Sequence, residues 1–444
     1  MTTLKRRLAT LAVVALSLPG LRGSAQAQDS GDEPQEKEKA KPEKSEEAAP
    51  PAEREAPPPS IAAAPVIAPE TAATVGFAPP PSAGRIEGPN ASIQFGVLLQ
   101  PQFELAGSPD ATKTSKNLFL RRARFMVGGT LFKSLEFFFQ VDYPNLFKFD
   151  PSDTMAFDKN APGLNIQDAF VTYKPIGELI KIDAGFMLPP LSHNSLESAA
   201  KLYGPDYFVN TFRRYVTNNT DPFRAAGQSP VGRDAGVQAR ALLVNGHIDV
   251  RAGLFMGRRT APTPADAMNP AVVAGTNFFR TSARLQINLL DAEPGFFYQG
   301  TYLGARKILS LGGFYEFQDN YKYFGGDLIA DLPAGPGIFT AQANLGQWDG
   351  GTWLQLIKQR VYMVEAGYII GPLMLSPIVH FERLTSYTPA PDAAIPSEDR
   401  LGGGLVFWPY GHNSNLKVFY TRVKRTPSDH AFDVFNVQWQ VYYF

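Results

Sequence analysis

Apolar and polar residues alternate along most of this chain, over segments longer than an ordinary β-strand. Between Ile93 and Leu105 the odd positions are almost all apolar, and the even positions are mostly glutamine, glutamate or glycine. Successive side chains of a strand point to opposite faces, so this period of two indicates strands with one apolar and one polar face. Soluble sheets typically use strands of about five or six residues, whereas a membrane-spanning strand needs about 9–11. The pattern therefore predicts an all-β chain of membrane-length strands.

The alternation recurs as far as the last residue. It returns at 135–142, 180–186 and 280–289, and the end of the chain alternates until it stops on Phe444. An apolar outer face, a polar inner face and interfacial aromatic residues are typical of outer-membrane β-barrels. In the last segment the odd positions, which share one face of the strand, are Val437, Trp439, Val441 and Tyr443. Phe444 has the other parity, so we expect a bulge or a local slip that returns it to the lipid-facing side.

Tight and long connections alternate along the chain, as the two ends of an outer-membrane barrel require. Val244-Asn245-Gly246-His247 has the signature of a two-residue hairpin. Counting the alternating segments predicts a transmembrane antiparallel β-barrel of about 16 strands, an even number that is consistent with both termini in the periplasm.

The longest connection runs from Pro189 to Arg233, between the fifth and sixth strands, and contains a helix signal. Asn194 is a candidate N-cap, Glu197 completes a capping box, and Gly204-Pro205 ends the segment. The apolar stripe of this helix is formed by Leu196, Ala199, Ala200 and Tyr203. A wide barrel would otherwise be an open hole, so we expect this third external loop, with its short helix, to fold into the lumen.

Two segments precede the barrel. A basic start, an apolar run and the small-x-small site Ala25-Gln26-Ala27 predict a signal peptide at 1–27. Residues 28–90 are rich in proline, alanine, glutamate and lysine, and this composition predicts a disordered periplasmic linker because it buries too little apolar surface. The folded barrel is then expected at 91–444. A contact of the linker with the cell wall is the functional alternative to a solvated tether.

Composition excludes several classes of protein. After the signal, no apolar run approaches the ~20 residues of a membrane helix. The chain has 42 basic and 42 acidic residues and no cysteine, so its net charge does not favour nucleic acid as a partner. The five histidines lack metal-ligand spacing, and there is no nucleophile elbow, so we expect no enzyme activity, cofactor or metal. His380 beside Glu382 is the best catalytic candidate, against the commoner role of a hydrogen-bonded lumen histidine.

Three stretches of the chain resemble the phosphate-selective porin O and P family. They are Leu120-Arg121-Arg122-Ala123-Arg124-Phe125, the block Ile166–Tyr173 leading to Gly185-Phe186 and Pro189-Pro190, and Tyr298–Gly304. The resemblance extends from Ile93 to Phe444. It implies a trimeric outer-membrane porin of about 16 strands, whose third external loop forms a constriction where basic residues guide anions. The resemblance does not identify the solute, which depends on the residues of the lumen.

Strand parity turns a set of basic residues toward the lumen. These candidates for the pore wall are Arg122, Arg124, Lys181, Arg240, Arg251, Arg280, Arg284 and Lys417. Arginines in a narrow pore can pass an anion from one charge-assisted contact to the next. The alternative is that they form ion pairs with the inward-facing acids. Those acids are Glu104, Glu136, Asp142, Asp168, Asp183, Asp249, Glu316, Asp327, Glu365 and Glu382.

One wall pair and one loop group are more specific candidates. If Asn245-Gly246 is the hairpin turn, Arg240 faces Arg251 on the lumen side. These like charges need a bound anion or a nearby acid, for which Asp249 is available. The basic residues of the long loop are Lys201, Arg213, Arg214, Arg224 and Arg233. Arg213-Arg214, flanked by aromatic residues, is a candidate for the constriction, and exposed loop charge is the alternative.

These residues favour a channel for passive diffusion of small hydrophilic solutes, with anions such as phosphate as the leading class. The expected location is the outer membrane of a Gram-negative bacterium, and the expected partners are the solutes, outer-membrane lipid and a homotrimer. A general diffusion porin with little charge selectivity is the nearest alternative. A surface receptor or adhesin would require large external loops, and a barrel-embedded hydrolase would require a serine or aspartate with a histidine in reach.

Overall fold

The computed structural model describes residues 84–107, 114–149, 163–208, 232–257, 278–293, 299–349, 358–387, 397–426 and 431–444. The predicted signal peptide and most of the predicted linker lie outside these ranges. The first eight barrel strands are β2 (Ala91–Gly107), β3 (Thr114–Leu131), β4 (Leu135–Asp142), β5 (Asn165–Ile176), β6 (Ile180–Met187), β7 (Asp234–Leu243), β8 (Ile248–Phe255) and β9 (Arg280–Asn288). The other eight are β10 (Ile308–Gln318), β11 (Tyr321–Ala334), β12 (Gly337–Asp349), β13 (Gln359–Ile370), β14 (Leu375–Ser386), β15 (Ser397–Tyr410), β16 (Ser414–Thr426) and β17 (Ala431–Tyr443).

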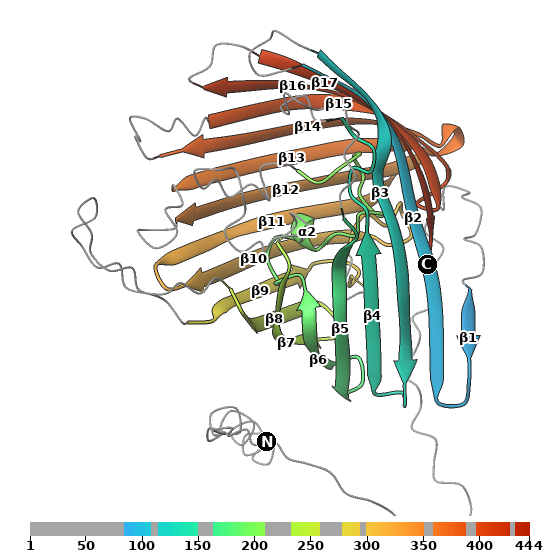
Figure 1. Ribbon diagram of the computed structural model, residues 1–444, viewed down its shortest axis with the longest axis vertical. Helices are drawn as coiled ribbons and strands as arrows, with labels where there is room; N and C mark the ends of the chain where they lie inside the picture. Colours follow the sequence, from blue (N-terminus) through green and yellow to red (C-terminus); the bar gives the residue numbers. More distant parts are fainter. Residues whose placement is uncertain are drawn as a thin grey trace, which may run out of the picture. The chain divides into compact units, whose positions relative to one another are not determined.

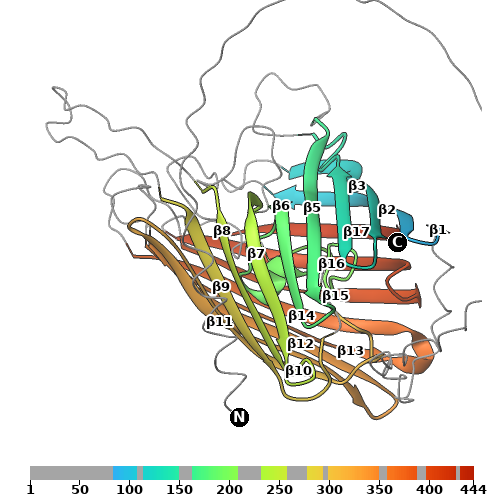
Figure 2. The ribbon, with the colours of Figure 1, turned by 90° about the horizontal axis from the view of Figure 1, so that it is seen from below.

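These sixteen strands close into one barrel, in which every strand pairs antiparallel with its sequence neighbours. The colours of Figure 1 therefore follow the order of the strands around the sheet, and Figure 2 shows the same strands from below. Closure joins the last strand to the first, because β17 pairs with β2 from Val434–Ala106 to Tyr443–Val97. The predicted fold class and strand number are confirmed.

The outer face of the barrel is apolar and the inner face is polar. Leu311 and Leu401 project outward with 46% and 63% of their surfaces exposed, whereas Gln100 and Asp183 are fully buried inside. Closure gives every strand two partners, which satisfies the backbone without water. An apolar band on a closed sheet matches a lipid environment, so the protein is an outer-membrane β-barrel. Within the described ranges, no helix has the length and apolar character needed to cross a bilayer.

Both ends of the barrel sequence lie at one end of the barrel, because β2 begins where β17 stops. Short turns at 132–134, 177–179, 335–336 and 411–413 join strands at this end, and short turns mark the periplasmic end of outer-membrane barrels. One connection there is long. It joins β9 to β10, and we call its described parts, residues 289–293 and 299–307, the periplasmic connection.

Phe444 lies on the inner side of the barrel, so the expected return to the lipid-facing side is wrong. Its ring packs edge-on against Phe138 of β4, with 5.6 Å between ring centroids. The ladder with β2 continues in register as far as Tyr443, and Phe444 follows with the inward parity of Tyr442. No bulge is needed, because the alternation itself turns the last ring toward glycines on β2 and β3.

Gly96 of β2 is one of these glycines, and its missing side chain leaves the space for Phe444. A Cβ atom at Gly96 would meet the Phe444 ring and lie 2.5 Å from the carbonyl oxygen of Tyr443. We call the pairing of β17 with β2 the seam of the barrel. We therefore expect Gly96→Ala to destabilise the seam by about 1–3 kcal/mol through overpacking. The temperature at which detergent-solubilised protein shifts to its unfolded electrophoretic mobility measures this. Gly313→Ala is the control, since its nearest neighbouring atom lies at 3.9 Å, and an equal shift in both variants would contradict the expectation.

A short additional strand, β1 (Arg85–Glu87), pairs antiparallel with β2 at Ser92–Gln94. This site lies just beyond Val97, where the pairing of β17 with β2 stops. β1 therefore continues the sheet at the seam. Part of the range 28–90 that was predicted as a linker is thus paired with the barrel.

The described part of the third external loop, residues 188–208, lies inside the barrel, and we call it L3. Its helix, α2, spans only His193–Leu196, and Ser192 rather than Asn194 is the N-cap. The helix ends before the predicted Gly204-Pro205 because Glu197 turns to extended backbone and forms a parallel bridge with Gln299. The predicted apolar stripe is nevertheless buried, at 1% exposure for Leu196, Ala199, Ala200 and Tyr203.

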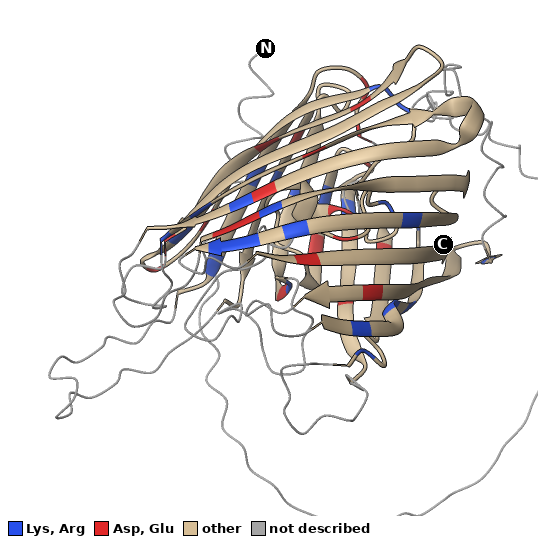
Figure 3. Ribbon diagram, turned by 90° about the horizontal axis from the view of Figure 1, so that it is seen from above, with Lys and Arg blue, Asp and Glu red and all other residues tan. Residues whose placement is uncertain are grey.

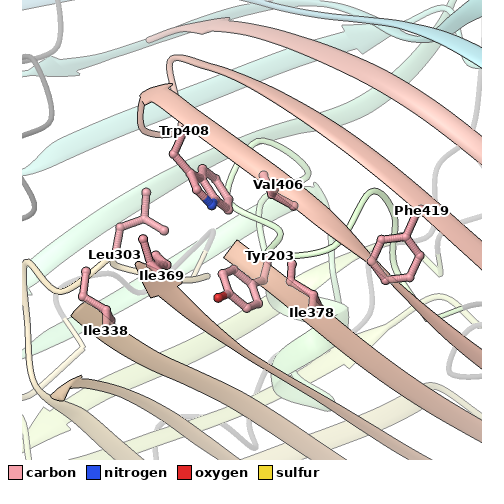
Figure 4. Packing of buried hydrophobic residues seen from close by; sticks show 8 residues of the cluster. All are labelled: Tyr203, Leu303, Ile338, Ile369, Ile378, Val406, Trp408 and Phe419. Atoms are coloured by element: carbon pink, nitrogen blue, oxygen red, sulfur yellow. The ribbon is translucent and has the colours of Figure 1, made fainter. Parts of the chain in front are cut away.

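An apolar cluster attaches L3 to one side of the barrel wall. Tyr203 of L3 stacks on Trp408 of β15 with 5.9 Å between ring centroids, and its hydroxyl hydrogen-bonds to Ser376. Figure 4 shows the buried group, in which Leu303 of the periplasmic connection joins Tyr203 against side chains of β12 to β16. Its remaining members are Ile338, Ile369, Ile378, Val406 and Phe419.

Candidate functional site

The candidate site is the charged interior around L3, where side chains of the wall hold the loop by its backbone. Lys417 of β16 donates to the carbonyl oxygens of Leu202 and Gly204 at 2.8 and 2.6 Å. Gln440 of β17 donates to the carbonyl of Ala200 at 2.8 Å. Lys417 lies on the inner face, as expected for a residue of the pore wall. Its two hydrogen bonds to the carbonyl oxygens of L3 show that it positions the loop.

A β-bulge brings two consecutive arginines to L3. The register of β2 and β3 shifts between Leu99 and Pro101, and this places Arg121 and Arg122 together on Asp206. Their ion pairs with the Asp206 carboxylate measure 2.6 and 2.5 Å. Burial would raise the pKa of Asp206, but the two guanidinium groups outweigh it and lower the pKa below its usual range. Arg122 therefore holds L3 on the wall together with Arg121. Strand parity predicted an inward position for Arg122 but not for Arg121.

Arg284 of β9 fastens the start of L3. It forms a bidentate pair with Asp327 at 2.6 and 2.8 Å and donates to the carbonyl of Leu191 at 2.9 Å. The same carboxylate accepts the backbone N–H of His193 at 2.9 Å. All of these groups are buried. The ion pair of Arg284 with Asp327 therefore stabilises the start of L3, and the backbone of L3 completes the hydrogen bonds of the pair.

His193 of L3 lies between two buried carboxylates. Its Nε2 is 2.9 Å from Glu293 of the periplasmic connection, and its Nδ1 is 3.5 Å from Glu197. Burial alone would lower the pKa of His193, but the two carboxylates outweigh it and raise the pKa to about 10. Burial would likewise raise the pKa of Glu293, and His193 instead lowers it to about 2. The imidazolium and the Glu293 carboxylate are therefore both charged at neutral pH.

A row of four cations crosses β6 to β9 on the inner face. The strand registers pair Lys181 with Arg240, Arg240 with Arg251, and Arg251 with Arg284. The predicted facing of Arg240 and Arg251 thus extends to two further strands. The turn is also as predicted, since the His247 N–H donates to the Val244 carbonyl at 3.1 Å.

Each cation of this four-cation row has a carboxylate beside it. Lys181 lies 2.8 Å from Glu178 and 3.1 Å from Glu136, and Arg240 pairs with Asp183. Arg251 pairs with Asp249 of its own strand at 2.7 Å. Like charges in register are thus compensated by acids, which was the alternative explanation for this pair. Figure 3 shows such basic and acidic residues interspersed along the strands.

The other predicted wall residues are also in ion pairs. Arg124 lies 2.9 Å from Asp142, and Arg280 lies 2.7 Å from Glu316. Arg233, at the end of the long loop, pairs with Asp168 at 3.0 Å. Lys201 is half-buried in L3, where its backbone carbonyl accepts the N–H of Thr301. Arg213 and Arg214 lie outside the described residues.

Two cavities lie inside the barrel, one toward its external end and one toward its periplasmic end. The external cavity, of about 510 Å³, is lined by Asp206, Tyr207 and Phe208 of L3 together with Arg121 and Arg400 of the wall. The periplasmic cavity, of about 300 Å³, is lined by Lys181, Arg240 and Phe444 among others. His380 lines the external cavity with its ring stacked on Phe419, 5.0 Å between ring centroids.

Neither a family model nor a curated protein sequence matches this chain. Solved structures of outer-membrane proteins do. The outer membrane channel DcaP of Acinetobacter baumannii is 13% identical, with 81% of this chain and 100% of that chain covered and a TM-score of 0.49. A loop L8 deletion mutant of OmpT, an outer membrane protein of Vibrio cholerae, is 12% identical, with 80% of this chain and 100% of that chain covered and a TM-score of 0.47. A BenF-like porin from Pseudomonas fluorescens is 11% identical, with 79% of this chain and 98% of that chain covered and a TM-score of 0.43. At this similarity, function has to be argued from the residues of the chain itself.

Proposed function

We propose that the protein is a channel for passive diffusion of small hydrophilic solutes across the outer membrane, and not an enzyme. The observation that carries the proposal is the inner face, which is lined by charged and amide side chains from every side of a closed barrel. Such a lining can exchange hydrogen bonds with a hydrated solute. The external and periplasmic cavities leave space inside the barrel, and L3 narrows the passage where it lies in the lumen.

We further propose that anions, including phosphate, are the preferred solutes. The four-cation row supports this proposal, since guanidinium groups in register can bind an anion at successive positions. The carboxylate beside each cation reduces the field along the row, so the preference should be small. A general porin with little charge selectivity is the second candidate, and the ion pairing of Arg251 with Asp249 favours it.

The resemblance to phosphate-selective porins supports a homotrimer, and we propose this assembly in outer-membrane lipid. We also propose that residues 1–27 are removed as a signal peptide and that the linker reaches into the periplasm, where it can contact the cell wall. The mass of the native protein in mild detergent measures the number of subunits.

Replacing both arginines of the facing pair tests the anion preference. Arg240→Gln with Arg251→Gln leaves Asp183 and Asp249 without their cations, so the reversal potential under a salt gradient should move toward cation permeation. Arg383→Gln is the control, because Arg383 and its partner Asp399 are exposed on the outer face. An unchanged reversal potential in folded double-mutant protein would reject an anion path along this row and leave the general porin.

A further inference from the structure

L3 and the periplasmic connection are in direct contact inside the barrel. Among the described residues, the external and periplasmic cavities have no lining residue in common. Ala199, Ala200 and Leu202 of L3 and Gln299 of the periplasmic connection are each 1% exposed. Two segments that enter the lumen from opposite ends of the barrel therefore meet here.

Backbone hydrogen bonds join these two segments edge to edge. Ser198 N–H donates to the carbonyl of Gln299 at 2.9 Å, and Thr301 N–H donates to the carbonyl of Lys201 at 3.1 Å. Glu197 and Gln299 are partners in a parallel bridge. The contact is thus a short stretch of sheet inside the lumen, a far smaller interaction than a barrel ladder.

The periplasmic connection is also fixed to the wall. Asp331 of β11 accepts the N–H groups of Tyr302 and Leu303 at 2.6 and 3.0 Å. His412 beside β16 lies 2.8 Å from the carbonyl of Thr301. These contacts hold the periplasmic connection on the barrel wall.

Glu293 is the side chain that ties the two halves together. It accepts from Gln299 at 2.8 Å and from Tyr302 at 3.0 Å within its own segment, and it pairs with His193 of L3 at 2.9 Å. It is 2% exposed. A charged pair buried between the two segments adds to their backbone contacts, since removing one partner leaves the other charge uncompensated.

We propose that L3 and the periplasmic connection form one gate, latched by Glu293 and His193, which separates when a solute passes. This inference rests on the proposed channel function and assigns to Glu293 control over how often the passage is open. The latch sets the opening frequency, while the ion pairs of the wall set the charge preference.

A reversible crosslink tests the gate, because the native chain contains no cysteine. Glu197→Cys with Gln299→Cys places two thiols on bridge partners, a separation compatible with disulfide geometry. In a planar bilayer, the oxidised double variant should lose most of its conductance, and reductant should restore it. The reduced form of the same protein is the matched control. Equal conductance before and after reduction of a fully formed crosslink would overturn the gate.

A second variant tests the latch without a crosslink. Glu293→Gln keeps the shape of the side chain and removes its charge, so the fraction of time spent open should rise roughly threefold or more. Glu87→Gln on β1, where the side chain is 68% exposed, should leave it unchanged. An unchanged open fraction in Glu293→Gln would reject the latch. If a crosslink forms but neither redox form conducts, the channel function itself fails, and this result is distinct from equal conductance in both forms.

Discussion

Replacing Asp327 with alanine is expected to lower the free energy of unfolding of the barrel by about 3–5 kcal/mol, because it leaves the Arg284 guanidinium buried without its counter-ion. The same change removes the acceptor of the His193 N–H, which holds the start of L3. Arg284 is 2% exposed, so solvent does not replace the lost carboxylate.

Urea unfolding of the protein in lipid vesicles, followed by tryptophan fluorescence, measures this change. Asp399→Ala is the matched control, since Asp399 and Arg383 are 39% and 50% exposed and an exposed pair contributes no more than about 1 kcal/mol. Equal losses in the two variants would show that the Arg284 pair does not stabilise the interior as described here.

Replacing Tyr203 with alanine should release L3 from the barrel wall. Tyr203 is 1% exposed and packs on Trp408, and loss of a buried aromatic ring costs about 3–5 kcal/mol. The lost energy weakens the packing of L3 on the barrel wall, and the pairing of the strands is unchanged. The barrel should therefore stay folded while trypsin cleaves more rapidly between 188 and 233, where the sequence offers arginines.

The rate of this cleavage, with the heat-induced mobility shift as the measure of the intact barrel, checks the expectation. Tyr410→Ala removes an aromatic ring that is 56% exposed on β15 and should leave the cleavage rate unchanged. If Tyr203→Ala unfolds the barrel at the same rate as it exposes the loop, L3 is part of the barrel core and not a docked segment.

Local pattern was enough to predict the barrel. The period of two repeats in every strand, and each strand needs only its neighbours, so the strand number, the hairpin at Asn245-Gly246 and the inward folding of L3 follow from short stretches. The facing of Arg240 and Arg251 also follows, because a two-residue turn fixes the register of both strands.

The partners of the lumen charges could not be predicted in this way. Asp206 lies far from Arg121 and Arg122 in the sequence, and the position of the two arginines depends on a bulge between β2 and β3. Glu293 lies in the periplasmic connection, and its partner His193 lies 100 residues away in the sequence. The length of α2 was overestimated because the bridge of Glu197 with Gln299 competes with the last helical turns. Phe444 was misplaced because a lipid-facing end was assumed instead of the parity that the chain has.

The conductance of purified, folded protein in a planar bilayer under a salt gradient tests the central claim most directly. The account predicts stepwise currents proportional to voltage, with a reversal potential slightly on the anion side of zero, because the four-cation row lies beside its carboxylates. Heat-modifiable barrels that insert into the bilayer and pass no current would contradict it.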